Sequence, residues 1–152
     1  MPSSPYVQEL RALVGHRLLV LPGVTAVIRH DDRFLLAQQR DSRLWSLIGG
    51  GIEPEEEPAH AVAREVTEEL GVTPRVGRII GAYGGEQLSN SYPNGDRVSY
   101  VTVAYECTLP ERRLTLEHDE VQAVAWVSRA DVASLPRHRW IDRVLDDASG
   151  SR

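Results

Sequence analysis

Three consecutive glycines, Gly49-Gly50-Gly51, followed directly by a strongly helical segment, constrain the fold of this chain more than any other feature. Glycine permits backbone conformations that other residues avoid, so we expect a loop here and no regular element. The next segment begins with Pro58, which suits a first helical turn, and ends before Gly71, which suits a C-terminal cap. One apolar stripe recurs at helical spacing: Ala59, Val62, Ala63, Val66 and Leu70. The pattern predicts a helix over 58–70.

Shorter β-prone and helical segments surround this helix. We predict strands at 17–21, 24–28 and 34–38, a short apolar piece at 45–48, and further strands at 74–83, 98–107 and 121–127. A polar turn at 30–33 would join the second and third of these. In 98–107 the residues Val101, Val103, Tyr105 and Cys107 alternate onto one face. With helices at about 5–14 and about 138–147, the order predicts an α/β fold in which a mixed sheet lies between helices.

Composition limits the class of protein. The chain has 152 residues, 41% of them hydrophobic, which is enough for one domain spanning 1–152. A formal net charge of -5 argues against general binding to polymeric nucleic acid or a membrane surface. The single Cys107 reads as a buried structural thiol. The chain has no membrane-length apolar run, and its first five residues do not resemble a signal peptide, so we expect a cytoplasmic protein.

Three carboxylates fan out along one flank of the predicted helix: Glu65, Glu68 and Glu69. Like charges at these spacings destabilise a helix by about 0.2–0.5 kcal/mol per pair, and Glu69 should lie partly against the sheet. One interpretation is a solvated acidic face in which Arg64 pairs with Glu68. The other is a site for a hard divalent cation, because such ions prefer carboxylate and carbonyl oxygens.

The preceding loop favours the cation site. Its glycines could turn a carbonyl toward the helix, and Glu53 and Glu56 could add carboxylates. The whole pattern resembles the signature of the Nudix hydrolases, G-x5-E-x7-R-E-U-x-E-E-x-G-U, where U is a bulky aliphatic residue. The matching positions are Gly50, Glu56, Arg64-Glu65-Val66, Glu68-Glu69 and Gly71-Val72. The resemblance implies the Nudix fold over most of the chain and a hydrolase that cleaves the diphosphate linkage of a nucleoside diphosphate derivative.

The resemblance also implies roles for these residues. Glu65 and Glu69 would be the principal ligands of Mg²⁺ or Mn²⁺, with Glu68 and the Gly49 carbonyl as further ligands. Arg64 would brace the glutamates, and Glu56 would orient or tune a metal ligand. Two positions depart from the common pattern, since many relatives have proline at Ile48 and glycine at Glu55. These changes put metal affinity and rate in doubt more than the type of reaction.

The general base is expected outside the signature. Glu120 is the leading candidate, because an acidic pair precedes the corresponding strand in several Nudix subfamilies. Glu117 and Asp119 are substitutes, and a solvated turn before a strand is the alternative. The five histidines are scattered without metal-ligand spacing and receive no role.

Candidate substrate contacts are Trp45, Tyr92 and Asn94. The last two lie in a polar stretch, 84–97, that contains strong turn formers, so it is either a simple hairpin turn or a substrate loop. Trp45, like Tyr83 and Trp126, could stack on a base or belong to the core.

The leading functional hypothesis is hydrolysis of a nucleotide such as an oxidised dNTP or an ADP-ribose-like compound. A second hypothesis is a Nudix sensor domain that binds a nucleotide without cleaving it. The complete set of carboxylates favours the enzyme. Isomerisation of an isoprenoid diphosphate is disfavoured because Cys107 lies far from the signature. Nudix relatives are often dimers, so a homodimer is one assembly to expect.

Overall fold

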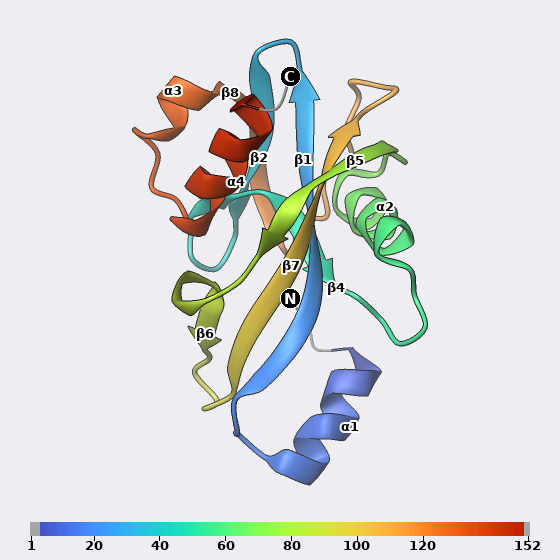
Figure 1. The fold of residues 1–152 in the computed structure, drawn as a ribbon, viewed down its shortest axis with the longest axis vertical. Coiled ribbons are helices and arrows are strands. Elements are labelled where there is room, and N and C mark those ends of the chain that lie inside the picture. The colour runs from blue at the N-terminus through green and yellow to red at the C-terminus, as the bar shows by residue number, and fades with distance from the viewer. Residues whose placement is uncertain (1–3, 151–152) are drawn as a thin grey trace.

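A mixed sheet of eight strands organises the computed structural model, which describes residues 4–150 (Figure 1). The strands are β1 (Leu19–His30), β2 (Arg33–Gln39), β3 (Trp45–Ser46), β4 (Ile48–Gly51), β5 (Arg75–Tyr83), β6 (Ser89–Ser91), β7 (Arg97–Thr108) and β8 (Val121–Ser128). The helices are α1 (Pro5–Val14), α2 (Pro58–Leu70), α3 (Arg129–Val132) and α4 (Trp140–Gly150), with one 3-10 turn, η1 (Glu86–Leu88). The main path runs β3-β2-β1-β7-β5, while β4 pairs with β1, β6 with β7 and β8 with β2. The predicted α/β class is confirmed.

The longest strand, β1, corrects two of the predictions. We expected separate strands at 17–21 and 24–28, but Pro22 and Gly23 do not interrupt the strand. The reason is a parallel pairing with β7 that is continuous from Leu19 opposite Val98 to Ile28 opposite Cys107. A proline removes only one donor from such a ladder.

The glycine triplet is the second correction, because it forms β4 and not a loop. Gly49 pairs with Thr25 and Gly50 with Val24, both antiparallel. A Cβ atom on Gly49 would lie 2.3 Å from the Val24 carbonyl oxygen, a separation that real Cβ atoms essentially never show. Glycine is therefore used here for close approach between two strands, and its conformational freedom does not prevent a strand.

Helices cover the two faces of the sheet (Figure 1). On one face, α2 packs Val62, Val66 and Leu70 against β1 and β7, in a cluster that also contains Tyr105 and Cys107. On the other face, α4 packs Ile141, Val144 and Leu145 against β2 and β5 residues. Cys107 is 1% exposed, as expected of a structural thiol, and burial raises its pKa to about 12.

The predicted alternation in β7 holds only in part. Val103, Tyr105 and Cys107 pack on the α2 face, but Val101 is 46% exposed. Val101 lies beyond the stretch of sheet that α2 covers, so no helix buries it.

The hairpin and the C-terminal segments complete the fold. The turn predicted at 30–33 joins β1 to β2, with Asp31 in the left-handed region at φ 53°. The last helix begins at Trp140, near the predicted start, and α3 was not predicted because it is only four residues long. Near the start of α4, the Asp142 carboxylate accepts two hydrogen bonds of 2.8 Å from Arg137. In the described part of the chain, no helix is long and apolar enough to cross a membrane.

Candidate active site

The helix α2 brings two glutamates into the protein interior. Gly71, at φ 70°, caps this helix by donating its N–H to the Thr67 carbonyl, as the sequence predicts. Glu65 and Glu69 lie one turn apart beside the apolar stripe and are only 5% and 8% exposed. Glu69 was expected to lie partly against the sheet, and the structure buries Glu65 as deeply.

Burial makes these two carboxylates hard to ionise together. Loss of hydration, together with the negative charges of Glu65 and Glu120, raises the pKa of Glu69 to about 9. Burial also raises the pKa of Glu65 to about 7, against the opposing influence of Arg64. Within residues 4–150, Glu69 makes no ion pair with any cationic side chain. The buried carboxyl group of Glu69 therefore has no positively charged partner among these residues.

Arg64 ties the loop to the helix. It donates hydrogen bonds of 2.8 and 2.9 Å to Glu56, one of 3.0 Å to Glu65 and one of 3.0 Å to the Gly51 carbonyl. Its contacts with Glu68 are longer, at 3.4 Å. Hydrogen bonding to Arg64 lowers the pKa of Glu56. The Arg64–Glu68 pair of the acidic-face interpretation is thus the weakest part of a larger bracing network.

Glu55, at which the sequence departs from the common pattern, lies in the loop before α2. That residue has φ 66°, a left-handed conformation that glycine adopts without steric cost. The neighbouring Glu56 accepts a hydrogen bond of 3.1 Å from the Glu53 amide. Glu56 is held between this amide and Arg64, and its side chain is 17% exposed.

A second acidic segment, 117–120, lies against the C-terminal end of α2. The Glu117 amide donates a hydrogen bond of 3.0 Å to the Glu69 carbonyl, which fixes the segment to the helix. Glu120 approaches the Glu69 side chain closely enough to hydrogen bond with it and raise its pKa. One carboxylate oxygen of Glu117, Oε2, is buried without a hydrogen-bond partner among the described residues. Glu65, Glu69 and Glu120, predicted from distant parts of the chain, therefore converge.

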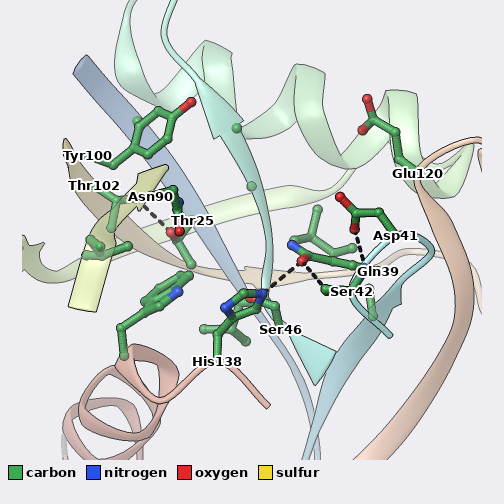
Figure 2. Close-up of a pocket in the computed structure, with 18 of the residues that line it drawn as sticks. Thr25, Gln39, Asp41, Ser42, Ser46, Asn90, Tyr100, Thr102, Glu120 and His138 are labelled. Carbon is green, nitrogen blue, oxygen red and sulfur yellow. Dashed lines mark hydrogen bonds between the residues drawn. The ribbon is translucent and has the colours of Figure 1, made fainter. Parts of the chain in front are cut away.

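Two cavities meet at this cluster. One, of about 530 Å³, is lined by Glu69, Gly49 and residues of β2 and α4, and the other, of about 580 Å³, by Glu65, Glu68 and residues of α1. Four residues line both: Tyr92, Pro93, Tyr100 and Glu120. Figure 2 shows the first cavity, with Glu120 on one side of it. Volumes of this size are typical of small-molecule sites.

The three candidate substrate contacts are placed differently. Tyr92 lies at the junction of the cavities, and Asn94 lines the second, where its side chain also bonds to Asp96. Trp45 does not line either cavity and packs in the core cluster beneath α4. The stretch 84–97 contains a hairpin turn between β6 and β7, and that turn also forms part of the cavity wall.

Comparison with known proteins identifies the family. A model of the NUDIX domain matches residues 20–148. The chain belongs to the Nudix domain family. Like other Nudix hydrolases, it is an enzyme acting on phosphorus-containing anhydrides.

Individual relatives extend over most of the chain. A MutT-like protein of Streptomyces ambofaciens is 30% identical over 125 residues, covering 82% of this chain and 74% of the relative. The CTP pyrophosphohydrolase of Escherichia coli K12 is 32% identical over 117 residues, covering 74% of this chain and 79% of the relative. The MutT protein of Methanosarcina mazei Go1 shares the fold, with a TM-score of 0.71 at 23% identity over 88% of this chain and 96% of that one.

Nudix hydrolases generally need divalent cations, and the donor chemistry of this site fits them. Within residues 4–150, no three acidic, histidine or cysteine side chains already stand close enough to hold an ion. The carboxylates nevertheless converge on the side of α2 that faces the cavities, and burial raises the pKa values of Glu65 and Glu69. Hard cations bind such oxygen donors and would remove the repulsion between them.

Several cavity residues were missed by reasoning from sequence. His138 received no role, and Gln39, Tyr100 and Trp140 were not considered as site residues, yet all four line the first cavity. They come from β2, β7, the first residue of α4 and the segment just before it, which the fold brings together. No local spacing marks such residues, so only the three-dimensional arrangement could have identified them.

Proposed function

We propose that this Nudix hydrolase cleaves the diphosphate linkage of a nucleotide-type substrate with Mg²⁺ or Mn²⁺. The observation that carries the proposal is the convergence of Glu65, Glu69 and Glu120 at the junction of two cavities. A diphosphate placed at that junction would have one half of the substrate in each cavity. A site with room on both sides of the reacting bond suits a linkage between two substituents.

The proposed ligands are Glu65, Glu69, Glu68 and the Gly49 carbonyl. Bound divalent ions would neutralise phosphate oxygens and lower the pKa of a water molecule. Arg64 has no need to touch substrate, because its hydrogen bonds are used to hold Glu56, Glu65 and the Gly51 carbonyl in place. Its role in this proposal is to position the ligands.

Glu120 is the proposed general base. It lines both cavities, and it lies within hydrogen-bonding reach of Glu69. From that place a carboxylate oxygen of Glu120 would accept the proton of the attacking water. Oxygen–phosphorus bond formation and departure of the second phosphate-bearing half would complete the reaction.

A panel of nucleotides tests the substrate class. The relative from Escherichia coli is named for CTP, which supports including canonical triphosphates beside oxidised dNTPs and ADP-ribose-like compounds in a panel. The test is to incubate purified protein with Mg²⁺ and each compound and to follow phosphate-bearing products. Binding of a nucleotide without turnover of any compound would contradict the proposal and favour a sensor.

Variants assign the roles. We expect Glu65→Gln and Glu69→Gln to lose most turnover, and full turnover in either would show that the metal site is misplaced. Glu120→Gln should fold normally and lose rate by roughly 10²–10⁴-fold, the usual contribution of a general base. An unchanged rate would transfer the role to Glu117 or Asp119, or to neither.

A further inference from the structure

The first cavity has an end that suits an uncharged, flat group. Among the described residues that line it, none is lysine or arginine. His138, at this end, is uncharged near neutral pH because burial lowers its pKa. Trp140, two residues after His138, supplies aromatic surface. Phosphates would find no cationic side chain here, whereas a nucleobase would find a flat wall and polar groups.

The amide of Gln39 is held in one orientation at this end. Its Oε1 lies 2.8 Å from His138 Nε2 and 3.2 Å from Ser42 Oγ. Ser42 Oγ accepts a hydrogen bond from the Leu44 amide, so its own hydrogen is available for Gln39. An oxygen can only accept, so His138 carries its proton on Nε2.

This arrangement leaves the Gln39 NH₂ group as a donor without a protein partner among the described residues. Figure 2 shows Gln39 extending into the cavity, opposite the wall formed by Thr25, Thr102 and Asn90. If the side-chain amide of Gln39 could rotate, it could present either its oxygen as an acceptor or its NH₂ group as a donor to a ligand. Because His138 and Ser42 both occupy the oxygen, Gln39 can only donate to a ligand.

Asp41 places an acceptor beside this donor. One of its carboxylate oxygens accepts a hydrogen bond of 2.7 Å from the Ser42 amide, which steadies the side chain. Figure 2 shows Asp41 next to Gln39, and both line the same cavity. A ligand that meets both residues must therefore present an acceptor to Gln39 and a donor to Asp41.

We propose that Gln39 and Asp41 select nucleotides whose base carries an amino group next to an unprotonated ring nitrogen, as in cytosine and adenine. The inference rests on the proposed function, because it concerns the substrate of that site. Uracil and hypoxanthine present the opposite pattern, with N–H facing the Gln39 donor and a carbonyl oxygen facing the Asp41 carboxylate. Such a mismatch leaves the Gln39 donor and the Asp41 carboxylate facing like groups on the base, so neither gains a hydrogen bond from the ligand and affinity is lost.

The test compares two pairs of nucleotides, CMP with UMP and AMP with IMP. Within each pair, the base of the first carries an amino group where the second carries an oxo group. Calorimetry on the full chain measures their binding, and steady-state kinetics with Mg²⁺ compares CTP with UTP and ATP with ITP. We expect the amino compound of each pair to be preferred by roughly tenfold or more, in affinity and in kcat/KM. Equal binding within both pairs would overturn the proposal.

Two variants examine the mechanism. Gln39→Glu keeps the shape but replaces the NH₂ donor with an acceptor, so it should abolish or reverse the preference. The matched control is Gln38→Glu, the adjacent position, whose side chain bonds to the Arg43 carbonyl and does not line the cavity. It should leave the preference unchanged. A preference that survives Gln39→Glu would refute the assignment.

His138 acts here as a positioning residue. His138→Ala frees the Gln39 amide to rotate, so the amino-to-oxo ratio should fall toward one through KM, with kcat for the preferred nucleotide much less affected. An unaltered ratio in a folded variant would contradict the orienting role. If the amino nucleotides bind better but none is hydrolysed, base selection is upheld and the proposed reaction is contradicted. If nucleotides are hydrolysed with no preference for the amino compounds, the reaction is upheld and base selection is contradicted.

Discussion

Replacing Glu69 with glutamine should make the metal-free protein more stable. Glu69 is 8% exposed, and burial with neighbouring carboxylates raises its pKa from 4.5 to about 9. Below pH 4.5 the folded and unfolded chains both hold the proton, so burial has no electrostatic cost. As pH rises toward 9, the unfolded chain releases the proton first, and folding becomes less favourable by about 1.4 kcal/mol per pH unit.

At pH 7.5 this penalty reaches about 4 kcal/mol. Glutamine has nearly the same shape and no charge, but its amide needs partners of its own, which offsets part of the gain. We therefore expect a net stabilisation of about 2 kcal/mol, or a rise in Tm of roughly 4–8 °C for a chain of this size.

The assay is thermal unfolding in EDTA at several pH values. The Tm difference between Glu69→Gln and wild type should be small near pH 4.5 and widen toward pH 8. Glu68→Gln is the matched control, because the Glu68 side chain is 57% exposed and should change Tm little. Added Mg²⁺ should reverse the order, since an ion at 100 times its Kd stabilises wild type by about 2.7 kcal/mol. A Glu69→Gln variant that is less stable than wild type in EDTA at pH 8 would refute the reasoning.

Three further substitutions probe the scaffold. Glu55→Gly should stabilise the protein by about 0.5–1 kcal/mol in urea unfolding, because φ 66° strains a side chain. The control Glu57→Gly, at φ -70°, relieves no such strain and should change stability little. Gly49→Ala should destabilise the protein by about 1–3 kcal/mol, because a Cβ atom at Gly49 would lie 2.3 Å from its nearest neighbour. Gly51→Ala should change stability little, because the nearest atom to a Cβ at Gly51 lies at 4.0 Å. Asp142→Asn should lower stability by about 1–2 kcal/mol at pH 7. Because its arginine partner lowers the pKa of Asp142 below 3.8, that difference should shrink as pH falls below 3.8 in thermal melts. No effect at pH 7, or an equal effect at pH 3, would contradict this last expectation.

Helix α2 could be predicted from the sequence because its signals are local. Pro58, the apolar stripe and Gly71 lie within one continuous segment, and the observed helix has the predicted bounds. The hairpin turn at 30–33 was predicted for the same reason. The burial of Glu65 was not foreseen, because it depends on how far the helix rotates toward the sheet.

The errors came from contacts between distant segments. The glycine triplet reads as a loop until Thr25 and Val24 are seen to pair with it. The strand through Pro22 is continuous only because β7, some 80 residues later in sequence, lies parallel beside it. The cavity residues Gln39 and His138 are 99 positions apart in sequence and form a hydrogen bond that no sequence spacing predicts.

Phosphorus NMR of a nucleotide reaction tests the central claim most directly. With wild-type protein and Mg²⁺, the signals of the intact diphosphate linkage should give way to those of two phosphate-bearing products. The same reaction should stop in EDTA and in the Glu69→Gln variant. Cleavage that continues at the wild-type rate in either condition would contradict a metal-dependent site built on the carboxylates of α2.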